Sequence, residues 1–128
     1  MRYAIILALL LVHGCTHGPS IKSLPFVTAP IGSMAKFSVS QLKMQGELVA
    51  VQDTGYVIIN LSDRVVFAPF ASVRNMRIPT LNRAVSGYPS ESDRRALRLA
   101  SRYPQGLSNE ILRALLARRS QLIVERLQ

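Results

Sequence analysis

Side chains that could carry out catalysis are few in this chain. It has one cysteine, Cys15, and two histidines, His13 and His17, all near the N-terminus. Residues 34–128 contain neither type, which excludes a Ser-His-Asp triad, a Cys-His pair and nearly every zinc site from them. The sequence also has no Gly-rich phosphate loop and no dinucleotide fingerprint. The acidic residues are explained more simply as turn formers, helix caps or helix-surface charges: Glu47, Asp53, Asp63, Glu91, Asp93, Glu110 and Glu125. We therefore expect a non-catalytic protein without a cofactor or a metal.

The single cysteine stands at the end of a short apolar segment. Residues 1–15 begin with Met-Arg, continue with ten apolar residues and end in His13-Gly14-Cys15. A basic start, a short apolar run and a small residue before the cut are the three parts of a secretory signal. A membrane-spanning helix needs about 20 apolar residues, so this run favours export over a permanent span. We expect residues 1–14 to be a signal peptide.

Val12-His13-Gly14-Cys15 resembles the lipobox of bacterial lipoproteins, although His13 stands where that motif usually has a small residue. The resemblance implies that cleavage leaves Cys15 as the new N-terminus, where it carries fatty acids such as palmitate. It also implies a membrane-anchored protein facing the periplasm or the cell exterior, with Thr16 favouring the outer membrane if the host is Gram-negative. The alternative is a buried core cysteine, but the polar residues after Cys15 give it little to pack against.

Arginines gather on one side of a helix expected at residues 91–103. At about 100° per residue, one side carries Arg94, Arg95, Arg98 and Arg102, and the other carries Ala96, Leu97, Leu99, Ala100 and Tyr103. Near an anionic bilayer, each basic residue contributes about 1 kcal/mol within a Debye length of about 8 Å. We expect these arginines to bind an anionic surface. The alternative is a solvated helix face whose arginine stems cover apolar surface.

The chain as a whole is basic, with 16 Lys and Arg against 7 Asp and Glu and a net charge of +9. Such an excess of positive charge indicates an anionic partner, or it serves only to keep a small protein soluble. The expected partners are therefore the membrane itself through the lipid anchor, an anionic lipid, or another envelope protein.

The elements that must position these residues divide the chain into three parts. Residues 15–33 contain three prolines and two glycines without a periodic pattern, which favours a flexible tether behind the lipidated Cys15. Residues 34–128 form a single small α+β domain. Within it, residues 36–78 hold short β-branched runs, and turns are expected at Gln45-Gly46, Asp53-Thr54-Gly55 and Ser62-Asp63. This spacing predicts a small antiparallel β-meander or barrel, in which Pro69 lies on an edge strand or ends one.

Two C-terminal helices follow the strands. Ser90 can cap a helix over residues 91–103, and Ser108 can cap a second over residues 109–127. Because the connection between them is short, we expect the two helices to pack antiparallel and to cover the open face of the sheet.

Residues 44–53 and the two strands after them resemble an Sm-like or SH3-like small barrel over about 40 residues. Sm-like proteins read RNA partly through an Asn soon after the aspartate and an Arg-Gly near the last strand, where this chain has Thr54-Gly55 and Arg74-Asn75. The resemblance thus implies a shape without the RNA function, and no nucleic acid is expected as a partner. We expect an envelope lipoprotein with a structural or interaction role. The alternative is an Sm-like nucleic-acid-binding module, if the N-terminus is not an export signal.

Overall fold

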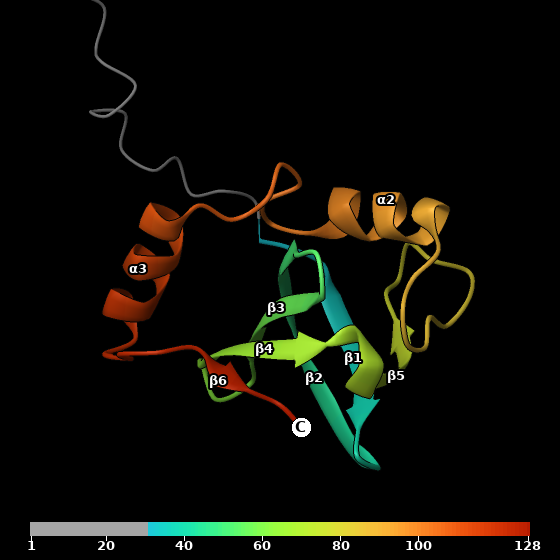
Figure 1. Ribbon diagram of the computed structural model, residues 1–128, viewed down its shortest axis with the longest axis horizontal. Helices are drawn as coiled ribbons and strands as arrows, with labels where there is room; N and C mark the ends of the chain where they lie inside the picture. Colours follow the sequence, from blue (N-terminus) through green and yellow to red (C-terminus); the bar gives the residue numbers. More distant parts are fainter. Residues whose placement is uncertain (1–30) are drawn as a thin grey trace, which may run out of the picture.

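A computed structural model describes residues 31–128 (Figure 1). Cys15, the expected signal peptide and most of the expected tether lie outside the described residues. The domain has an α+β fold, as the sequence predicted, with a strand-rich part followed by two helices. Its elements are β1 (Met34–Val39), β2 (Leu42–Val51), β3 (Gly55–Asn60), β4 (Val65–Pro69), the 3-10 helix η2 (Phe70–Ser72), β5 (Val73–Arg77), α2 (Glu91–Ala100), α3 (Asn109–Arg118) and β6 (Glu125–Arg126).

The sheet has six strands in the order β5-β1-β2-β3-β4-β6. Strands β1 to β4 form the predicted antiparallel meander, and β5 returns to pair antiparallel with β1. The short β6 pairs parallel with β4, which makes the sheet mixed. The sheet is open, with β5 and β6 as its edges, so the closed barrel that the sequence allowed is not formed. β4 ends at Pro69 as predicted.

One of the three predicted turns is wrong. Gln45 and Gly46 lie inside β2, and the chain reverses earlier, at Ser40 and Gln41, which have φ values of 48° and 67°. Two successive positive φ values are typical of the tight hairpin turns whose twist matches the strands. Gly46 has a packing role instead, because a Cβ there would lie 2.5 Å from the Ile59 carbonyl oxygen. The turns at 53–55 and 62–63 are confirmed.

Successive side chains of the central strands enter two separate apolar clusters. In β3, Tyr56 and Ile58 belong to one cluster, and Val57 and Ile59 belong to the other. Because neighbouring side chains on a strand point to opposite faces, the two clusters lie on opposite faces of the sheet. α2 contributes Leu97 to the first cluster, while α3 contributes its buried leucines Leu115 and Leu116 to the second. Each face is therefore covered by a different helix.

This arrangement corrects the expected antiparallel helix pair. In Figure 1 the two helices stand well apart, α3 beside β4 and β6 and α2 near the loop after β5. The segment that connects the helices lies against β2, where the Arg102 and Tyr103 amides donate to the Leu48 and Val49 carbonyls at 3.0 and 2.9 Å. The segment between α2 and α3 is therefore hydrogen-bonded to β2, and the two helices do not pack against each other.

Both helices end earlier than predicted. α2 stops at Ala100, where Ser101 adopts an extended conformation and its hydroxyl donates to the Arg98 carbonyl at 2.6 Å. α3 stops at Arg118 instead of residue 127, and Ser120 turns the chain with a φ of 50°. The chain then runs to β6, so the apolar residues after 120 belong to an extended segment. Leu122 in that segment is 95% exposed.

Candidate anion-binding surfaces

The four arginines predicted to face an anionic surface have different surroundings. Arg94 is partly buried, with its guanidinium carbon 5.3 Å from the centroid of the Phe70 ring. Arg102 lies beyond the end of α2 and pairs with Glu47. Arg95 is exposed and Arg98 partly so, and neither forms an ion pair within the described residues. The structure therefore leaves Arg95 and Arg98 as the two arginines of this set that are free for an outside partner.

Glu47 and Arg102 form a largely buried ion pair with two parallel hydrogen bonds. The Arg102 Nε and Nη2 atoms donate to the two carboxylate oxygens of Glu47 at 2.6 and 2.5 Å. The Gly32 amide donates to the same carboxylate at 2.7 Å. The hydrogen bonds that Arg102 donates to Glu47 raise the pKa of Arg102 further above its ordinary value. The pair therefore fixes the chain where it joins the domain, a role that sequence reasoning missed when it treated Glu47 as a turn or surface charge.

Leu99 faces the solvent, contrary to the predicted apolar side of the helix. It is 75% exposed, whereas the neighbouring Leu97 is fully buried. At about 100° per residue, Leu99 lies about 40° from Arg95 around the helix and about 160° from Leu97. The helix thus presents Leu99 next to the unpaired Arg95, with the unpaired Arg98 on the far side of Arg95, about 100° from the leucine.

Ile31 lies beside this leucine. It is 79% exposed, and it lines a surface cavity of about 440 Å³ together with Leu81, Ala96 and Leu99. We use the name α2 patch for Ile31, Arg95, Arg98 and Leu99. This patch combines apolar and cationic groups at the place where the described part of the chain begins.

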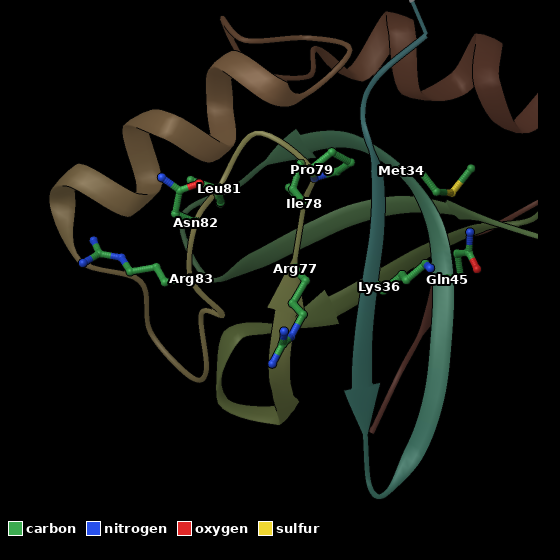
Figure 2. Close-up of a pocket in the computed structure, with 9 residues that line it drawn as sticks. All are labelled: Met34, Lys36, Gln45, Arg77, Ile78, Pro79, Leu81, Asn82 and Arg83. Carbon is green, nitrogen blue, oxygen red and sulfur yellow. The ribbon is translucent and has the colours of Figure 1, made fainter.

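A second basic region lies on the outer side of β1, β2 and β5. Two cavities of about 490 and 650 Å³ share the side chains of Lys36, Gln45 and Arg77. Figure 2 shows Lys36 and Gln45 on adjacent strands, Arg77 at the end of β5, and Leu81 to Arg83 on the loop that follows. Lys43 lines the second cavity. We call these joined cavities the basic groove.

Among the residues that the structure describes, no acidic side chain lines the basic groove, whereas three cations besides Arg83 do. Arg83 is held by an ion pair with Asp93, and its hydrogen bond is the main reason that the pKa of Asp93 lies below its ordinary value. Lys36, Lys43 and Arg77 have no acidic partner in the described part of the chain. Sequence reasoning missed this groove, because β1 and β5 are adjacent only in the folded sheet.

Within residues 31–128, no group of three or more His, Cys, Asp or Glu side chains could hold a metal ion. Neither of the helices described there has the length and apolar character needed to cross a membrane. No family of known proteins matches the chain, and neither curated proteins nor solved structures gave a significant match. The candidate sites are therefore argued from their own chemistry.

Proposed function

We propose that this protein is a non-catalytic lipoprotein of the bacterial envelope, exported by residues 1–14 and anchored by fatty acids on Cys15. The α2 patch then rests on the anionic surface of the membrane that holds the anchor. The N-terminal sequence supports the anchor, and the exposure of Leu99 next to Arg95 on α2 is the observation that supports the membrane contact.

The position of Ile31 favours contact between the α2 patch and the anchoring membrane. Ile31 lies sixteen positions after Cys15, and this length of chain spans at most about 55 Å when fully extended. The Gly32 amide donates to the Glu47 carboxylate, and the Ser33 amide donates to the Ala100 carbonyl. These two hydrogen bonds hold the chain just after Ile31 against the domain. Ile31, the first residue that the structure describes, thus belongs to the α2 patch itself.

The expected strength of this contact suits a tethered domain. Arg95 and Arg98 contribute about 2 kcal/mol together near an anionic bilayer, and burial of Leu99 adds about 2 kcal/mol. A total of about 4 kcal/mol corresponds to a dissociation constant near 1 mM. A short flexible tether supplies an effective concentration in the same millimolar range. The patch therefore binds appreciably only when the anchor holds it near the membrane.

An environment-sensitive fluorophore placed at residue 99 tests the contact. Once Cys15 is acylated, Leu99→Cys introduces the only free thiol, and the labelled protein is reconstituted into vesicles of phosphatidylglycerol or of phosphatidylcholine. We expect a blue shift of emission in phosphatidylglycerol that is lost in the Arg95→Gln/Arg98→Gln background. Leu122→Cys provides the control, because this exposed position lies outside the α2 patch. Identical emission from both positions in both kinds of vesicle would contradict the proposal.

A further inference from the structure

We infer that the basic groove binds a single-chain anionic amphiphile, a molecule with a carboxylate or phosphate head on an alkyl chain. This inference is independent of the α2 patch and of the lipid on Cys15, because none of the residues that define the patch carries the groove's charge. It rests on the charges, the apolar surface and the dimensions of the groove.

The cations of the groove are placed close together without an acid between them. Lys36 and Arg77 are direct partners in the register of β1 and β5. Like charges opposite one another on neighbouring strands disfavour strand pairing. On the other side, Lys36 faces Gln45 of β2, which supplies an amide but no negative charge. An anionic head bound at Lys36 and Arg77 would offset this repulsion and accept hydrogen bonds from both side chains.

Apolar surface lies on both sides of these cations. The first cavity adds Met34, Pro79 and Leu81, and the second adds Met44 and the exposed Leu61. Lys36, Gln45 and Arg77 line both cavities and therefore lie where the two meet. An alkyl chain can follow either apolar arm while its head stays at the centre. The two volumes, about 490 and 650 Å³, fall within the range of about 300–1,000 Å³ that is usual for small-molecule sites.

The residues that line the groove disfavour two other anionic ligands, single-stranded nucleic acid and inorganic phosphate. Proteins that bind single-stranded nucleic acid stack its bases on exposed aromatic rings. Among residues 31–128, the one aromatic side chain that lines the groove is Phe37, and it is 3% exposed. Inorganic phosphate would contact the cations and leave the apolar arms empty. An amphiphile uses both kinds of surface.

Photolabelling of the full chain in phosphatidylcholine nanodiscs tests the inference. The nanodisc holds the chain through its lipid or through its apolar leader, so the assay does not depend on processing at Cys15. Three probes carry a diazirine in a dodecyl chain and differ only in the head: a carboxylate, a phosphate or an uncharged hydroxyl. We expect the two charged probes to give adducts on groove residues such as Met34, Leu61 and Leu81, and the uncharged probe to give few.

Neutralising the centre of the groove should reduce this labelling. We expect Lys36→Gln/Arg77→Gln to lower adduct yield about tenfold, a typical consequence of losing hydrogen bonds to a charged head. Arg113→Gln/Arg118→Gln is the matched control, because it removes two exposed arginines of α3 that have no ion pair in the described chain. Urea unfolding of each variant separates loss of binding from loss of folding.

Several outcomes would overturn the inference. Equal labelling by the uncharged probe would show that the alkyl chain alone selects the site. Competition by inorganic phosphate as strong as that by dodecyl phosphate would identify a simple anion site, and stronger competition by a short RNA would identify a nucleic-acid site. Adducts that map outside the groove, or that persist in Lys36→Gln/Arg77→Gln, would exclude it as the binding site.

Discussion

Among single residues, Glu47 joins three separate segments of the domain. Its carboxylate accepts hydrogen bonds from Arg102, which follows α2, and from Gly32, where the chain joins the domain. One side chain of β2 thus ties together three segments that are distant in the sequence. Removing its charge would leave the Arg102 guanidinium buried without a counterion.

We therefore predict that Glu47→Gln lowers the free energy of unfolding by about 2–3 kcal/mol, somewhat less than is usual for a fully buried pair. The measurement is urea unfolding of the full chain. Asp63→Asn serves as the control, because the Asp63–Arg119 pair has an exposed carboxylate and is expected to contribute about 0–1 kcal/mol. Equal losses in the two variants would show that Glu47 has no special role.

Tyr56 is the second residue with a distinctive environment. Its ring is fully buried and meets the Phe70 ring edge to face at a centroid distance of 4.8 Å. Its hydroxyl has no hydrogen-bond partner among the described residues. Burial raises the pKa of the Tyr56 hydroxyl above its ordinary value. The ring therefore stabilises the core, while the hydroxyl adds a desolvation cost.

We predict that Tyr56→Phe leaves the free energy of unfolding unchanged or raises it by up to about 1 kcal/mol, because it removes an unpaired polar group. The pH dependence has a definite sign. Above about pH 10 the unfolded chain loses this phenolic proton before the folded chain does, so wild-type stability falls as pH rises. Urea midpoints measured on both sides of pH 10 should show a smaller fall for Tyr56→Phe than for the control Tyr88→Phe, whose ring is largely exposed. A clear loss of stability at neutral pH would contradict the prediction.

At the scale of elements, a single glutamine fastens the C-terminal segment to the sheet. The Gln121 side chain accepts from the Val65 amide at 2.8 Å and donates to the Val65 carbonyl at 2.7 Å. It also donates to the Ile123 carbonyl at 2.8 Å. These bonds hold the chain after α3 at the start of β4, from which it continues as β6 alongside that strand.

We predict that Gln121→Ala lowers the free energy of unfolding by about 2–3 kcal/mol, since it leaves the buried amide and carbonyl of Val65 without partners. Gln105→Ala is the matched control, because Gln105 lies exposed in the loop between the helices. Differential scanning calorimetry measures the stability, and hydrogen exchange at Leu127, whose amide donates to Phe67, reports whether β6 has detached. Unchanged exchange and stability in Gln121→Ala would refute this role.

The sequence allowed the strands to be predicted better than the helix ends. Short runs of β-branched and aromatic residues between positions 36 and 78, separated by turn residues, mark the strands, and the α+β class follows from these strands and the two capped helices. The second helix was predicted to reach residue 127, because Leu122, Ile123 and Val124 continue a helix-favouring apolar run. What ends it is a tertiary contact, the hydrogen bonds of Gln121 to Val65, and a linear pattern does not reveal such a contact.

The candidate sites were predictable only in part, for the same reason. Helical periodicity identified Arg95 and Arg98 as surface residues, but it placed Leu99 on the buried side and Arg102 on the exposed side. Arg102 lies after the helix and meets Glu47, which comes from β2. The basic groove depends on β5 pairing with β1, and neither strand's own sequence specifies that neighbour.

At the scale of the whole molecule, charge and attachment act together. Four of the seven acidic residues are engaged in ion pairs with arginines, so most of the positive charge has no counterpart within the described residues. Free cations occur both in the α2 patch and in the basic groove. The proposed lipid on Cys15 would bring the α2 patch to an anionic membrane surface, and the proposed role in the envelope depends on that attachment.

Incorporation of radiolabelled palmitate, followed by fractionation of the cells, tests this attachment most directly. We predict that the wild-type protein carries the label and is recovered with membranes, and that Cys15→Ser abolishes the labelling. Glu47→Gln should still incorporate palmitate, because it alters the folded domain and leaves the leader and Cys15 intact. An unlabelled wild-type protein, recovered from the cytosol with its first 14 residues still present, would contradict the account.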